Sequence, residues 1–100
     1  MKIHFTPESL NDLRRLREFI TMKDPAAARR TADTIQSGIV KLKQFPQLGV
    51  AVLRSPQPKK MRDLFIGEYT IRYLVGVSEL VVLRIWHDKE SGRSDQTSDF

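Results

Sequence analysis

The sequence predicts a single α+β domain in which a helical hairpin packs on one face of a small antiparallel sheet, in the order β-α-α-β-β-β. Three observations support this fold. Residues 61–87 contain three runs rich in Val, Ile, Leu and aromatic side chains, divided by turn residues at 67–68 and 76–78. Two upstream stretches, starting at Pro7 and Pro25, place apolar residues at helical spacing. Their short connection predicts antiparallel neighbouring helices.

Local signals define the elements that precede the sheet. Residues 2–5 are a strand candidate because apolar and polar side chains alternate there. Thr6 is a good N-cap for the first helix, and Asp24 for the second; in each case a proline follows at the first helical position. We expect the second helix to reach about Phe45, because Pro46 cannot continue it.

The remaining segments divide into loops, a short extended piece and a tail. Residues 45–49 form a turn, residues 50–53 are a candidate extended piece, and two prolines make residues 55–60 a loop. The chain after His87 is polar and has almost nothing to bury. We therefore expect a single domain over residues 1–89 and a flexible polar tail over residues 90–100.

The composition is that of a globular protein, since 40% of the 100 residues are hydrophobic and 29% are charged. The absence of cysteine excludes a disulfide framework and a thiol nucleophile, and with two histidines the sequence predicts no metal site and no cofactor. No signal-like start and no run near the ~20 apolar residues of a membrane span appears, so we expect a cytoplasmic protein with no membrane contact. The net charge of +5 favours acidic partners.

The first turn of the predicted meander fixes one set of neighbours. A two-residue turn after Ile66 places Asp63 opposite Arg72 on one face of the sheet, where the two side chains form a salt bridge. The apolar residues of these two strands then form the opposite, helix-covered face. The register of the last strand stays open, because a shift of one residue moves Arg84 and Trp86 to the other face.

Cationic side chains are the candidates for chemistry. They lie before, within and at the end of the sheet: Lys59, Lys60, Arg62, Arg84 and His87. A histidine near neutral pKa is suited to general acid–base catalysis, and the cations are suited to an anionic substrate. Each also has a structural interpretation: a solvated loop for the lysines, an ion pair for the arginines and a structural contact for the histidine.

The whole pattern resembles the RelE/ParE superfamily of toxins from type II toxin–antitoxin pairs. The matching segments span roughly residues 2–88. They are KIHFTPESLNDL, DPAAARRTADTI, KLKQFPQLG, MRDLFIGEYTIRYLV and VVLRIWHDK. No single motif decides the resemblance; the combination of FPQLG, RDLFIGEYTIRY and a strand ending in LRIWH carries it.

The resemblance implies one of two activities. RelE-like members are ribosome-dependent messenger RNA endonucleases, for which the five cationic residues above would form the catalytic set. ParE-like members inhibit DNA gyrase without such chemistry. Here the tail has no tyrosine, which departs from the RelE pattern, while the long second helix, the FPQLG turn and the basic Lys89 after His87 are more similar to ParE. The ParE-like interpretation, a gyrase-inhibiting toxin that is not an enzyme, is therefore favoured, with the interferase as the alternative.

The resemblance also implies a partner. Such toxins pair with a cognate antitoxin that carries a flexible, partly disordered segment, and the basic charge of this chain suits an acidic, ParD-like one. A hetero-oligomer with the antitoxin is expected, with contacts on the helical hairpin. The candidate contact residues are Leu13, Leu16, Ile20 and Ile35. These positions also suit a plain hydrophobic core.

Overall fold

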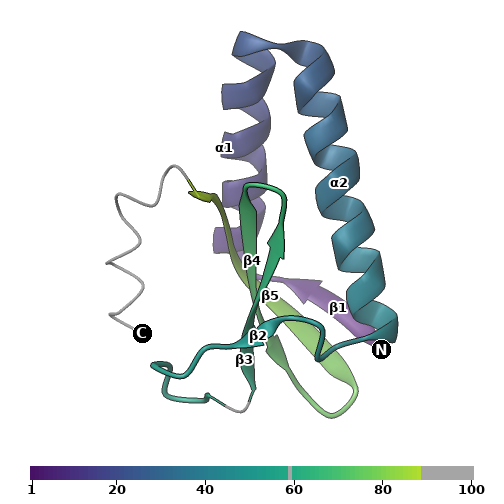
Figure 1. Cartoon of the computed structure of the whole chain (residues 1–100), viewed down its shortest axis with the longest axis vertical. Coiled ribbons are helices and arrows are strands. Elements are labelled where there is room, and N and C mark those ends of the chain that lie inside the picture. Colours follow the sequence, from purple (N-terminus) through teal and green to yellow (C-terminus); the bar gives the residue numbers. More distant parts are fainter. Residues whose placement is uncertain (59, 89–100) are drawn as a thin grey trace.

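The computed structural model describes residues 1–58 and 60–88. Its elements follow the predicted order, and the candidate extended piece at residues 50–53 contains one further short strand between the helices and the meander (Figure 1). They are β1 (Lys2–Phe5), α1 (Pro7–Lys23), α2 (Pro25–Gln44), β2 (Val50–Ala51), β3 (Met61–Ile66), β4 (Tyr69–Val75) and β5 (Glu79–His87). Lys59 and the tail predicted for residues 90–100 lie outside the described part of the chain.

The five strands form one sheet in the order β1-β5-β4-β3-β2. The meander β3-β4-β5 is antiparallel as predicted, but the sheet as a whole is mixed because β1 runs parallel to β5. A parallel pair requires a crossover connection, and here the helical hairpin provides it between β1 and the meander. The sequence predicted β1 as a strand but carried no signal for the edge at which it joins the sheet.

Both helices begin where the capping residues predict. The Ser9 N–H donates to Oγ1 of Thr6 at 3.0 Å. The carboxylate of Asp24 accepts from the N–H groups of Ala26 and Ala27 at 3.1 and 3.2 Å. These bonds satisfy donors that have no partner within a helix. Asp24 is the single residue between α1 and α2, so the hairpin is tight and the helices are antiparallel.

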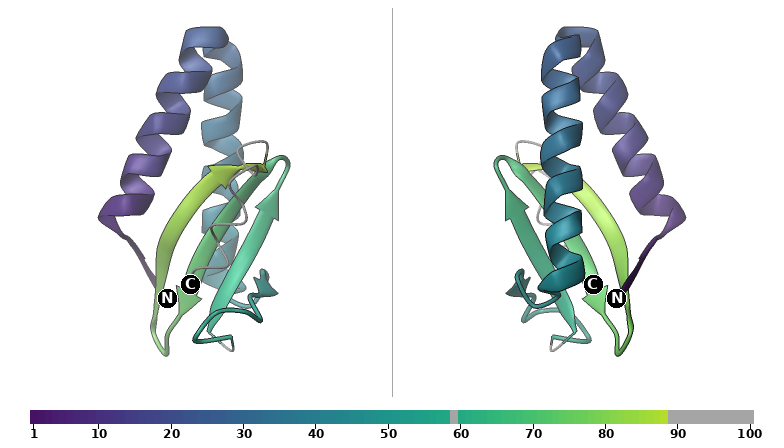
Figure 2. Two further views of the ribbon diagram at one scale, coloured as in Figure 1. Left: turned by 90° about the vertical axis from the view of Figure 1, so that its left-hand side faces the viewer. Right: turned by 90° about the vertical axis from the view of Figure 1, so that its right-hand side faces the viewer.

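The helices cover one face of the sheet and extend beyond its end (Figures 1 and 2). Buried apolar side chains from both helices and from β3, β4 and β5 fill the space between the two layers. They are Leu16, Ile35, Leu42, Leu64, Ile71, Tyr73, Leu80, Val82 and Ile85. Gly38 of α2 lies so near β3 that a Cβ there would overlap the end of the Ile66 side chain, so the glycine permits close packing of helix on sheet.

The predicted pairing of β3 with β4 is confirmed. Ile66 lies opposite Tyr69, and Asp63 lies opposite Arg72. The Arg72 guanidinium donates to both carboxylate oxygens of Asp63 at 2.8 and 2.9 Å, and it lies 5.1 Å from the centre of the Trp86 ring. Because side chains alternate along β4 and Ile71 and Tyr73 belong to the core, this ion pair lies on the face away from the helices.

A β-bulge settles the register of β5. The ladder pairs Tyr73 with Val82 but Arg72 with Arg84, so Leu83 is an extra residue in β5. The bulge reverses the alternation and places Arg84 on the face of Arg72. The sequence left this face open because turn length alone cannot fix it when a bulge follows.

Candidate partner-binding site

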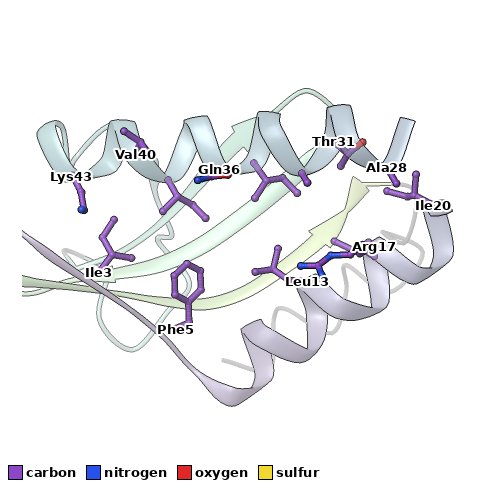
Figure 3. A pocket seen from close by; sticks show the side chains of 14 residues that line it. Ile3, Phe5, Leu13, Arg17, Ile20, Ala28, Thr31, Gln36, Val40 and Lys43 are labelled. Atoms are coloured by element: carbon purple, nitrogen blue, oxygen red, sulfur yellow. The ribbon is translucent and has the colours of Figure 1, made fainter. Parts of the chain in front are cut away.

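A groove runs between α1 and α2 and is closed at one end by β1 (Figure 3). Its volume is about 500 Å³. The two helices lie closest at the hairpin tip and spread apart toward β1, which opens the groove (Figure 2). All four residues predicted to contact an antitoxin line it: Leu13, Leu16, Ile20 and Ile35. The structure therefore brings them together on one surface.

The groove has an apolar floor and a partly basic rim. Leu16 and Ile35 are buried and belong to the core, whereas Leu13 and Ile20 are half-buried. Ile3 and Phe5 of β1 extend the apolar lining. Basic Arg17 and Lys43 stand at the exposed edges, on α1 and α2 respectively, as Figure 3 shows. An apolar trough with cations at its margins is complementary to an amphipathic helix that carries acidic residues on its polar side.

Arg84 is held by an ion pair with α1. Its guanidinium donates to the two carboxylate oxygens of Asp12 at 2.8 and 3.2 Å, and one of these oxygens also accepts from the Ile85 N–H at 2.9 Å. Asp12 is 2% exposed. Because β1 pairs with β5 only as far as Val82, Asp12 takes the place of a further strand at this edge of β5. This geometry favours the structural interpretation of Arg84.

Arg62 is directed at the turn that follows α2. Its Nη1 donates to the carbonyl of Gly49 at 2.7 Å and to that of Gln47 at 3.4 Å. The hydroxyl of Tyr73 donates to the Pro46 carbonyl at 2.7 Å and accepts from the Gly49 N–H at 2.8 Å. One arginine and one tyrosine thus bind the backbone of the FPQLG turn. The buried N–H and C=O groups of such a turn need hydrogen-bond partners, and these two side chains provide them.

His87 lies at the far end of the sheet from Arg62. Its Nε2 is 3.3 Å from a carboxylate oxygen of Glu68, and its ring meets the Tyr69 ring edge-on at 4.8 Å between centroids. Strand alternation puts His87 and Arg62 on the helix side of the sheet, and Arg84 on the opposite side. Lys60 is exposed in the loop before β3, and Lys59 lies outside the described residues. The described members of this set do not converge on one point.

Tyr73 is fully buried. Burial raises its pKa above that of a free tyrosine, although the Gly49 N–H and the Arg62 charge act in the opposite direction. An unfolded tyrosine ionises near pH ~10 while the folded Tyr73 keeps its proton, so the free energy of unfolding must fall as pH rises above about 10. We expect the Tyr73→Phe variant to lack the part of this fall in unfolding free energy that Tyr73 causes.

The measurement is urea unfolding of the wild type and Tyr73→Phe at pH 8 and pH 11. Each protein is compared with itself across pH, so other titrating groups affect both equally. An equal loss of stability in the two proteins would show that Tyr73 does not contribute.

The family was identified by comparison with known proteins. The model of the "ParE toxin of type II toxin-antitoxin system, parDE" matches residues 3–92, which is most of the chain. The chain belongs to the ParE toxin family. The predicted resemblance to the RelE/ParE superfamily is thereby confirmed.

This ParE-family toxin is also similar to a curated relative and to a solved structure. Toxin RelE3 of Caulobacter vibrioides is 29% identical over 92 residues, which cover 88% of this chain and 95% of the relative. Among solved structures, one described as the chromosomal ParDE TA system from P. aeruginosa superposes with a TM-score of 0.71 at 21% identity. That match covers 87% of this chain and 95% of the other and shows that the two share a fold.

Some residues of the ParE-family site were not predicted. Asp12 stands among charged residues of α1 and reads as part of a solvated face, so nothing in the sequence distinguishes it as the partner of Arg84. The contact of Tyr73 with the FPQLG turn was not predicted either. The position of Arg17 at the rim of the groove was likewise not predicted.

Two further findings apply to the part of the chain that the structure describes. Neither helix is long and apolar enough to cross a membrane. Within residues 1–58 and 60–88, no three acidic, histidine or cysteine side chains gather in a way that would hold a metal ion.

Proposed function

We propose that this ParE-family toxin inhibits growth by acting on DNA gyrase and is neutralised by a cognate, acidic, ParD-like antitoxin. The observation that carries the choice of target is the separation of the candidate catalytic residues. Under this proposal the protein works in the cytoplasm, forms a hetero-oligomer with its antitoxin, and serves in plasmid maintenance or growth control. It needs no cofactor.

Ribosome-dependent RNA cleavage is the alternative, and its chemistry makes a geometric demand. Attack of a 2′-hydroxyl on the adjacent phosphate needs a base, an acid and cations around one phosphorus. In this protein Arg62 binds backbone carbonyls, Arg84 binds Asp12 from the other face, and His87 lies at the far end of the sheet. The arrangement does not provide such a centre among the described residues, which supports the gyrase interpretation.

The groove supports the antitoxin half of the proposal. Leu13 and Ile20 are half-buried in the toxin alone, so an amphipathic helix that packs on them removes further apolar surface from water. Acidic residues on the polar side of that helix would meet Arg17 and Lys43. A segment that is disordered before binding could order itself on this surface.

Substitution of His87 tests the absence of acid–base chemistry. We expect His87→Gln to inhibit growth within about twofold of the wild type, because glutamine can still reach Glu68 and no proton transfer is needed. Loss of a general acid or base typically costs ~10²–10⁴-fold in rate. The measurement is the amount of induced toxin that halves the growth rate, with the toxin quantified in each culture.

His4→Gln is the matched control. His4 lies on β1, 3.5 Å from the Glu79 carboxylate, and so shares the histidine–glutamate pairing without belonging to the candidate set. A hundredfold loss in His87→Gln with normal inhibition by His4→Gln would favour RNA cleavage and count against the proposal.

A further inference from the structure

A second surface lies on the edge of the sheet formed by β2 and β3. Four large apolar side chains are exposed there: Leu48 (48%), Val50 (60%), Leu53 (81%) and Phe65 (59%). We call these four residues the edge patch. Val50 and Phe65 line two adjoining hollows, one of about 580 Å³ on the α2 side and one of about 370 Å³ on the opposite side. The edge patch is therefore continuous across the sheet edge.

The backbone at this edge is incompletely paired. β2 pairs with β3 only at Val50–Asp63 and Ala51–Arg62, and the Met61 carbonyl accepts from the Val52 N–H at 2.9 Å. By the alternation of an antiparallel ladder, the N–H and C=O of Phe65 point to the same side as those of Met61. Within the described residues no strand pairs with β3 there.

Such an edge is usually protected. Soluble proteins place charged side chains, prolines or covering segments on exposed edges, because an unpaired strand is a template for another chain. Phe65 lies between Leu64 and Ile66 and opposite Thr70. The nearby carboxylates of Asp63 and Asp88 are bound by Arg72 and Thr70 respectively. Apart from the paired Asp63 and Arg72, the charged residues that line the two hollows are the cations Lys41 and Arg54. The edge patch is thus apolar in the middle and basic at its margins.

The edge patch and the groove lie on opposite sides of α2. The groove is lined by Ile35, Ile39 and Lys43 of this helix, whereas the hollow beside the edge patch is lined by Gly38 and Lys41. Figure 2 shows the same division, with β1 and α1 on one side of α2 and β2 and β3 on the other. The two surfaces have separate linings, so each can be substituted without changing the lining of the other.

We propose that the toxin's protein target binds here by adding an extended segment antiparallel to β3, beyond the end of β2. This inference rests on the proposed function and names the surface through which the toxin acts. The segment would pair with the backbone of Phe65, place an apolar side chain against Val50 and Phe65, and direct carboxylates at Lys41 and Arg54. Its chemistry is that of an acidic strand with alternating apolar residues.

Charge substitution in the edge patch tests the inference. We expect Phe65→Lys to raise the amount of toxin needed for growth inhibition at least about tenfold, because a charge replaces an apolar contact at the centre of the interface. Val50→Lys, at a second exposed position, should act in the same direction. Val77→Lys is the matched control, because Val77 is 102% exposed in the turn between β4 and β5 and the chemical change is the same.

Purified DNA gyrase is the probe for direct binding. With wild-type toxin, gyrase should slow hydrogen exchange at residues 61–66, where the Phe65 N–H would gain a partner, and Phe65→Lys should abolish this effect. Normal growth inhibition by Phe65→Lys and Val50→Lys would overturn the inference while leaving the proposed function intact. A wild-type toxin that neither inhibits growth nor binds gyrase would overturn both.

Two other occupants give distinct results, and each would overturn the inference. If the edge patch instead binds the antitoxin, Phe65→Lys will fail to co-purify with the antitoxin encoded beside the toxin but will still inhibit growth. If it binds a second copy of the chain, light scattering will give a dimer for the wild type and a monomer for Phe65→Lys, again with growth inhibition retained.

Discussion

Asp12→Ala should lower the free energy of unfolding by about 2–4 kcal/mol. The change removes a buried carboxylate that accepts a hydrogen bond from the Ile85 N–H. It also removes the carboxylate to which the Arg84 guanidinium donates two hydrogen bonds. The edge of β5 beyond β1 would also lose its link to α1. Urea unfolding followed by circular dichroism measures the difference.

Asp12→Asn is the companion variant. Asparagine keeps an oxygen that can accept from the Ile85 N–H but loses the charge that pairs with Arg84, so its loss of stability should lie between those of the wild type and Asp12→Ala. If Asp12→Ala unfolds at the same urea concentration as the wild type, Asp12 does not hold α1 to β5. In that case the structural interpretation of Arg84 is wrong as well.

Gly49→Ala should be nearly as damaging, with a loss of about 2–3 kcal/mol. A Cβ at this position would lie 2.8 Å from the Asp63 carbonyl oxygen and 2.8 Å from the Tyr73 hydroxyl. Both atoms belong to rigid, buried surroundings, so the FPQLG turn itself would have to move and its bonds to Tyr73 and Arg62 would weaken. For a domain of this size the melting temperature should drop by roughly 10 °C or more.

Gly38→Ala makes the same chemical change with a different neighbour. There the new Cβ would meet the terminal methyl group of Ile66, which can rotate, and alanine gains up to ~1 kcal/mol in helix propensity over glycine. We expect its stability to stay within about 1 kcal/mol of the wild type. Equal melting temperatures for Gly49→Ala and Gly38→Ala would contradict the account of the FPQLG turn.

Local chemistry explains which parts of the fold were predictable. The caps at Thr6 and Asp24 act on their own neighbours, and the turn after Ile66 sets the pairing of β3 with β4, so residues close in sequence carry the information. The parallel joining of β1 to β5 and the bulge at Leu83 depend on contacts between distant segments. Those contacts exist only once the layers have packed, and periodicity cannot reveal them.

The candidate site also contains residues that were predictable from the sequence and contacts that were not. The groove residues Leu13, Leu16, Ile20 and Ile35 were predictable because helical spacing alone places them on facing sides of a hairpin. The cationic residues were identified by type, but their partners were not: Asp12 for Arg84, and the backbone carbonyls of the FPQLG turn for Arg62. The edge patch had no sequence signal, because Phe65 and Val50 resemble ordinary strand residues until their exposure is known.

The most direct test of the proposed function places purified toxin with gyrase, supercoiled DNA and ATP, and in parallel with ribosomes programmed with messenger RNA. The proposal predicts that cleaved DNA accumulates while the message stays intact. Cut message with undamaged DNA would contradict it and would make Lys60, Arg62, Arg84 and His87 the first residues to examine for catalysis.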